Sequence, residues 1–262
     1  MTVSLKKTAR KSNASNKATA LSGVALHNAS TAPLTATALA IVAEPIVTLR
    51  DKALSFDAAT VDAYALTLDA SFDRRDIFEA SKGTATVGKA SAYAVEKNRM
   101  LKAKIAVSRL FLALDLQASN VVERSLAENS MFSAYGLKKI TELAQYVCGF
   151  GSKLEIVTRA FFACSLIATD RGLTVIDNET NRRFLCSRGF TDAISDQELI
   201  AKLDDLRLRS MSSGAETQSS QARNVLDVLG LGSIKSINKP RDSIVIDASH
   251  GLFTMFRGDF MK

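Results

Sequence analysis

The histidines and cysteines are the residues best suited to catalysis or metal binding. His250 follows an aspartate and a serine, but sequence neighbours do not form a catalytic triad, and no G-x-S-x-G nucleophile motif is present. The three cysteines, Cys148, Cys164 and Cys186, are widely spaced, and none belongs to a C-x-x-C pair that would suit zinc. We therefore expect buried free thiols, no metal and no enzymatic activity.

Motifs that bind nucleotides or other small ligands are also missing from the sequence. It contains neither a G-x-x-x-x-G-K-[ST] phosphate loop nor a G-x-G-x-x-G turn after a strand. The signatures of RNA-recognition and KH domains are absent too. The adjacent Asp204 and Asp205 have arginines close by, which is typical of a solvated helix face. No cofactor and no small-molecule substrate is predicted.

The basic residues remain as candidates for function. The chain carries 34 Lys and Arg against 27 Asp and Glu, a net charge of +7. Five of these bases precede the first acid, Glu44, and residues 1–33 are predicted to be a flexible basic arm. Such an arm suits phosphate binding, and the alternative is a solvated tail. Neither a secretory signal nor a membrane span is evident, so we expect a cytoplasmic protein with no membrane partner.

A second group of cations lies on a predicted long helix, Ala90–Leu116, which lacks Gly and Pro and consists mostly of good helix formers. Apolar side chains occupy two broad sectors of this helix, so most of its circumference should be buried. Arg99, Lys102 and Arg109 fall on one narrow stripe between the sectors. A groove lined by spaced cations would hold a phosphate backbone. The alternative is a surface helix whose cations extend into solvent.

The predicted nucleic-acid contacts are basic side chains of the arm, the long helix and nearby elements. They are Lys6, Lys7, Arg10, Lys11, Arg74, Arg75, Lys97, Arg99, Lys102, Lys104, Arg109, Lys138, Lys139, Arg182 and Arg183. Phosphate contacts should supply most of the affinity. Aromatic stacking should be secondary, because the chain has four Tyr and no Trp.

The predicted elements indicate a mainly α fold with two lobes and a flexible basic N-terminal arm. The N-terminal helical lobe covers residues 34–150 and the C-terminal lobe residues 151–262. The elements predicted after residue 130 are helices at 137–148 and 152–169, a β-hairpin at 173–186, a helix capped by Ser195, a polar loop at 212–220, a short helix ended by glycine at 221–232, and a strand followed by an apolar segment at 242–256. Phe161 and Phe162 are expected in the core.

Three short segments resemble nucleocapsid proteins of segmented negative-strand RNA viruses, of the tospovirus and emaravirus type. "SAYGL" at Ser133–Leu137 is similar to an Ala-Tyr-Gly-Leu stretch of tospovirus nucleoproteins, and it lies downstream of a basic helix, as it does there. "LSFDAA" at Leu54–Ala59 and "NRM" at Asn98–Met100 resemble short emaravirus motifs. The resemblance implies a protein that coats viral RNA in a cleft between two lobes, with a terminal arm linking subunits. It implies that Arg99, Lys102 and Lys104 lie in that cleft.

The leading hypothesis is therefore a sequence-tolerant single-stranded RNA-binding protein, nucleocapsid-like and self-assembling through its N-terminal arm. It would work in the host cytoplasm or the virion. A winged-helix-like DNA or RNA binder of a phage or virus is the first alternative, since two helices precede a predicted hairpin carrying Arg182 and Arg183. A structural or adaptor protein without nucleic acid is the second.

Overall fold

Thr48 and Asp57 begin the first two helices of the computed structural model. The structure describes residues 47–81, 87–126, 132–150, 154–170, 172–173, 175–177, 214–235 and 243–260. Thr48 forms a reciprocal capping box with Asp51 at the start of α1 (Leu49–Ser55). Asp57 accepts a hydrogen bond from the Thr60 amide, 2.8 Å away, at the start of α2 (Ala58–Ser81). "LSFDAA" therefore forms the turn between two helices.

The predicted long helix at 90–116 is two helices, α3 (Val87–Lys102) and α4 (Lys104–Ala113), and the single-helix prediction was wrong at Ala103. Ala103 has φ −104° and ψ 17°, outside helical geometry. α3 packs mainly on α6, whereas α4 packs on α2 and α1 as well as α6. Nothing in the local sequence favours a break at an alanine, so we attribute the break to these different packing partners.

The "SAYGL" segment starts α6 (Ala134–Val147), after α5 (Ala118–Val122) and the short 3-10 helix η2 (Glu123–Leu126). Ser133 is the N-cap and accepts a hydrogen bond from the Tyr135 amide. A β-carbon on Gly136 would lie 2.5 Å from the Phe132 ring, so the glycine allows this close packing. These residues therefore shape the start of a helix.

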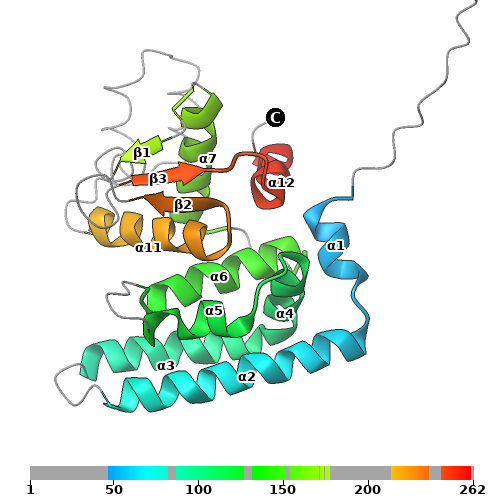
Figure 1. Ribbon diagram of the computed structural model, residues 1–262, viewed down its shortest axis with the longest axis vertical. Helices are drawn as coiled ribbons and strands as arrows, with labels where there is room; N and C mark the ends of the chain where they lie inside the picture. The colour runs from blue at the N-terminus through cyan, green and yellow to red at the C-terminus, as the bar shows by residue number, and fades with distance from the viewer. Residues whose placement is uncertain are drawn as a thin grey trace, which may run out of the picture. The chain divides into compact units, whose positions relative to one another are not determined.

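The C-terminal half combines helices with a small antiparallel sheet (Figure 1). Its elements are α7 (Ile156–Asp170), β1 (Val175–Asp177), α11 (Gly214–Val228), β2 (Gly232–Lys235), β3 (Ser243–Ile246) and α12 (Gly251–Phe260). The strand order is β1-β3-β2, with Ile244 of β3 opposite Ile176 and Ile234. α11 extends over residues 214–220, where a polar loop was predicted wrongly. Without apolar periodicity, those residues gave no helical signal.

The predicted hairpin at 173–186 is described only in its first strand. β1 pairs with β3, which is distant in sequence, and the returning strand of the predicted hairpin lies outside the described residues, as does the predicted capped helix at 195. The strand expected in 242–256 is confirmed as β3, and the apolar segment after it forms α12. Sequence patterning located β1 and β3, but it missed β2 and the pairing of the strands.

The buried core joins the helices on both sides of residue 150. Contacts group Pro45–Lys262 as one unit. Phe161 and Phe162 are buried, as expected, and Phe162 contacts Phe253 of α12 with ring centroids 5.0 Å apart. Cys148 and Cys164 are confirmed as buried free thiols, whereas Cys186 lies outside the described residues. Helices dominate the described part, which confirms the mainly α prediction.

None of the described helices has the length and apolar character needed to cross a membrane.

Candidate nucleic-acid interface

The described residues carry almost no net charge. They include 17 Lys and Arg against 18 Asp and Glu. The whole chain has 34 and 27, so its basic excess belongs to the segments outside the described residues. Residues 1–46 alone contain five bases and one acid. The described helices therefore do not form a strongly basic body.

Six of the predicted contact residues form ion pairs within the described part. The pairs are Arg74–Glu123 (2.6 Å), Arg75–Glu79 (3.4 Å), Lys97–Asp76, Arg99–Glu96 (2.7 Å), Lys104–Asp69 (3.2 Å) and Lys138–Glu155. Most of these pairs join two elements, as Lys97 of α3 and Lys104 of α4 each reach carboxylates of α2. A carboxylate partner cancels the field that a phosphate would experience. These cations are thus mainly part of the framework.

Arg75 is a correction to the predicted interface, because its side chain is only 1% exposed. It donates to the Val122 carbonyl oxygen at 3.0 Å and lies 4.8 Å from the centre of the Tyr93 ring. Desolvation lowers the pKa of this guanidinium, and the nearby Glu79 partly opposes the effect. Arg75 thus ties α2 to α3 and to the end of α5, and it does not face solvent.

Arg109 is a second correction, since it does not share an open stripe with Arg99 and Lys102. Its guanidinium donates to three backbone carbonyls at the end of α1 and the following turn, those of Ala53, Leu54 and Phe56, at 2.9–3.2 Å. The last carbonyls of a helix lack intrahelical partners and lie at the negative end of its dipole, so a cation is favourable there. Arg109 caps α1.

Lys139 is a third correction, because it is 3% exposed beside Glu142. Burial lowers the pKa of the Lys139 ammonium, although Glu142 and Glu155 act to raise it. Glu142 in turn accepts hydrogen bonds from the Glu155 amide and the Thr158 hydroxyl at the start of α7. This buried cluster of Lys139 and Glu142 connects α6 with α7, and it is not accessible to nucleic acid.

Arg99 and Lys102 are the predicted body cations best placed to meet a ligand. Both lie on the last turn of α3, and the Arg99 side chain is 46% exposed. Lys102 is exposed and has no ion-pair partner among the described residues. Both also complement the negative C-terminal end of α3. Two cations one turn apart can contact one or two phosphates, which is weak binding by itself.

The other predicted contacts lie outside the described residues. They are Lys6, Lys7, Arg10, Lys11, Arg182 and Arg183.

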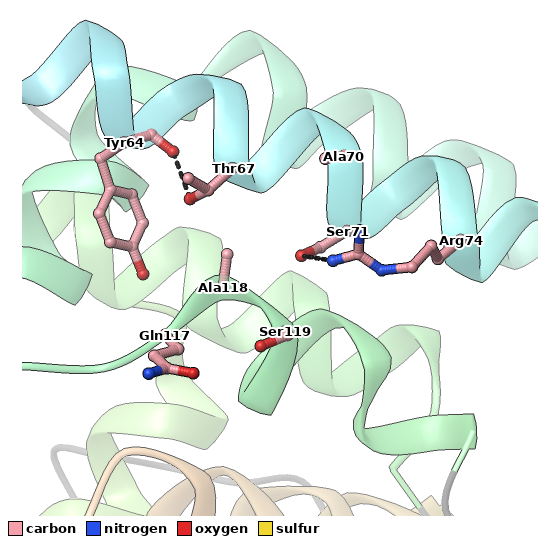
Figure 2. Close-up of a pocket in the computed structure, with 8 residues that line it drawn as sticks. All are labelled: Tyr64, Thr67, Ala70, Ser71, Arg74, Gln117, Ala118 and Ser119. Atoms are coloured by element: carbon pink, nitrogen blue, oxygen red, sulfur yellow. Dashed lines mark hydrogen bonds between the residues drawn. The ribbon is translucent and has the colours of Figure 1, made fainter.

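A pocket of about 400 Å³ lies between α2 and the beginning of α5, and no residue of the predicted stripe lines it (Figure 2). Of the predicted residues, Arg74 lines it. Tyr64 forms the opposite end, and its hydroxyl donates to the Leu116 carbonyl oxygen. Burial raises the pKa of Tyr64 to about 12, so the phenol stays protonated near neutral pH. Sequence reasoning missed this pocket, although Tyr64, Thr67, Ser71 and Arg74 have the spacing of one helix face.

His250 has a local structural role. Its Nδ1 accepts a hydrogen bond from the Leu252 amide at the start of α12, 3.2 Å away, and burial lowers its pKa. The Ser249 amide and hydroxyl both donate to Asp247. This Asp-Ser-His sequence therefore forms the turn that begins α12. Among the described residues, no group of three or more His, Cys, Asp or Glu side chains gathers to hold a metal ion.

No protein-family model, curated protein or solved structure matches this chain.

Proposed function

We propose that this protein binds single-stranded RNA with little sequence preference, mainly through phosphate contacts from its basic N-terminal segment. The distribution of charge is the observation that carries this proposal. The described body is nearly neutral, whereas residues 1–46 hold five bases and one acid. Clustered cations release counterions when they bind a polyanion, whereas cations already paired with carboxylates release few.

The last turn of α3 supplies a second contact on the body. Arg99 and Lys102 are exposed there one helical turn apart, and Lys102 has no carboxylate partner among the described residues. The resemblance of the three short segments to nucleocapsid proteins supports RNA as the polyanion. It also supports self-assembly through the N-terminal arm, in the host cytoplasm or the virion.

The experiment that tests the proposal compares two double variants of the full chain by RNA titration at several salt concentrations. Lys6→Gln/Arg10→Gln removes two arm cations. We expect the slope of log K against log salt to become shallower by about 1.4, because each phosphate contact on a single strand contributes roughly 0.7. The measurement is fluorescence anisotropy of a labelled single-stranded oligonucleotide.

The matched control is Lys52→Gln/Arg257→Gln, which also removes one lysine and one arginine. Both side chains lie on the body in exposed ion pairs, with Asp115 and Asp170. We expect the control to change neither the slope nor the affinity appreciably, since exposed pairs contribute little. Equal effects of the two variants would mean that only net charge matters. Salt-independent binding by the wild-type chain would reject the proposal.

A winged-helix-like nucleic-acid binder is the second candidate, and the connectivity of the C-terminal half favours it. The order helix, strand, helix, strand, strand, from α7 through β1 and α11 to β2 and β3, matches the order in winged-helix domains, and so does a sheet ordered β1-β3-β2. The intervening residues 178–213 lie outside the described part. In such domains, the helix before the last two strands would enter the major groove.

The burial of α11 places this candidate second. Gln221, Arg223 and Asn224 of α11 are each no more than 6% exposed, and the Gln221 side-chain oxygen accepts the Ser133 amide. α11 lies along α6 (Figure 1), so these polar side chains are not free to read bases. Competition between duplex DNA and single-stranded RNA distinguishes the candidates, because a preference for the duplex would favour the winged-helix reading.

A further inference from the structure

The pocket between α2 and α5 has the volume of a small-ligand site (Figure 2). Its volume of about 400 Å³ falls within the range of sites that hold cofactors and small molecules. Tyr64, Thr67, Ser71 and Arg74 line it from α2, at spacings of three and four residues that put them on one helix face. The site belongs to a well-packed part of the bundle, where α2 and α5 meet.

The Tyr64 wall is held rigidly before any ligand arrives. Its hydroxyl donates to the Leu116 carbonyl oxygen, and its ring meets Phe111 edge-on, with centroids 6.3 Å apart and planes at 79°. The Thr67 hydroxyl donates to the Tyr64 carbonyl oxygen at 2.7 Å, which fixes the next side chain along the helix. A preformed wall lowers the entropy cost of binding.

The α5 wall offers polar groups that are still available to a ligand. The Gln117 amide and the Ser119 hydroxyl both line the pocket, and among the described residues neither side chain has a hydrogen-bond partner. The side chains of Ala70 and Ala118 stop at a methyl group, which leaves room between the two walls. An amide carries both donor and acceptor atoms, so Gln117 can pair with a donor–acceptor edge.

Arg74 closes one end of the pocket, but it does not make the pocket a strong anion-binding site. Its Nε and Nη2 donate to Glu123, and Nη2 also donates to the Ser71 hydroxyl oxygen at 3.2 Å. The guanidinium is thus neutralised as a pair, although its Nη1 atom takes no part in these bonds. Because Glu123 already neutralises the guanidinium, a flat base with hydrogen-bonding edges suits this pocket better than a free anion, and Nη1 remains to donate to a neighbouring phosphate.

We propose that this pocket binds one unstacked purine base, with the Gln117 amide pairing to the base edge and the adjoining phosphate near Arg74. A glutamine amide pairs in two-point fashion with adenine. Single-stranded RNA presents such bases splayed from the strand. As the base of a bound RNA, the purine would add local base contacts to the phosphate binding proposed above, and this part of the inference rests on that proposed function.

The experiment fills the pocket with a larger side chain and measures the affinity for two probes. Adenosine 5′-monophosphate is measured by calorimetry and single-stranded oligoadenylate by anisotropy. Ala70→Leu places a larger side chain in the pocket. The matched control, Ala63→Leu, makes the same change at another exposed position of α2 that does not line it. Thermal unfolding of both variants checks that the fold is retained.

We expect Ala70→Leu to weaken mononucleotide binding by about fivefold or more relative to Ala63→Leu, because a two-point base contact contributes roughly that factor or more. Oligoadenylate affinity should fall as well, with a nearly unchanged salt slope, because Arg74 is already paired with Glu123 and the phosphate contacts elsewhere remain. Equal mononucleotide affinity in the two variants, or none in the wild type, would overturn the pocket. Mononucleotide binding without salt-dependent RNA binding would instead support the pocket and reject the proposed function.

Discussion

Neighbouring cations of the same type have very different surroundings in this protein. Arg74 is 53% exposed at the rim of the pocket, whereas Arg75, the next residue, is buried against Tyr93. Lys138 pairs with Glu155 at the surface, and Lys139 is buried beside Glu142. Consecutive residues on a helix point about 100° apart, so one of each pair faces the core. Residue type alone therefore does not identify a phosphate contact.

At the residue scale, Arg109→Met and Lys102→Gln should separate stability from binding. Arg109→Met leaves the carbonyls at the end of α1 without a cation, so we expect the free energy of unfolding to fall by about 2 kcal/mol. Lys102→Gln should leave stability unchanged and weaken RNA binding slightly. Urea unfolding and anisotropy measure the two effects. A stable Arg109→Met variant with weakened RNA binding would restore the predicted stripe.

At the element scale, a buried glutamate joins α6 to the start of α7. The Glu142 carboxylate takes the place of an N-terminal capping group for α7, by accepting from the Glu155 amide and the Thr158 hydroxyl. Burial, together with the nearby Glu155 carboxylate, raises the pKa of Glu142 to about 7 from its ordinary value of 4.5. Lys139, Lys138 and Thr158 act in the opposite direction. This junction should therefore respond to pH near neutrality.

The pH response has a definite sign. Because the folded state holds the Glu142 proton more tightly than the unfolded state, this group's contribution to stability is fully present below pH 4.5 and is lost as the pH rises to about 7. Glu142→Gln does not titrate, so we expect its unfolding free energy relative to wild type to increase between pH 4.5 and 7. Urea unfolding at several pH values measures this difference. A difference that does not change with pH would show that Glu142 titrates normally.

At the scale of the whole molecule, the helices before and after residue 150 are joined at several points. α6 packs along α11, the Ser133 amide donates to Gln221, and Arg124 of η2 pairs with Asp227 of α11. Their shared buried core leaves α11 little freedom to leave α6. If any nucleic acid used α11 for groove reading, these contacts would first have to break.

The shared core leads us to expect one cooperative unit in the described part. In native-state hydrogen exchange, the most protected amides of α6 and α11 should open with the same free energy and the same denaturant dependence. Both sets would then report global unfolding, because neither helix can open without exposing the common core. Earlier opening of α11 alone would indicate a separable C-terminal module, which is what the winged-helix candidate needs.

Sequence patterning determined which segments are helical and apolar, because that information is local. Apolar periodicity located α6 and α7 and placed Phe161 and Phe162 in the core, whereas the residues of α12 were predicted only as an apolar segment. It also separated the basic N-terminal segment from the rest of the chain. Each of these features depends on neighbouring residues along the chain, so it needs no knowledge of distant contacts.

Only the tertiary structure decided how each cation is used. Arg109 was predicted to line a phosphate groove, but it caps α1. The sequence prediction missed this contact because α1 lies more than fifty residues away along the chain. The break at Ala103, the pairing of β1 with β3 and the pocket between α2 and α5 likewise depend on distant segments. The C-terminal ends of helices and buried carboxylates are stabilised by nearby cations, which pair with their negative charge and donate hydrogen bonds to them. A spacing rule along one helix does not include those partners.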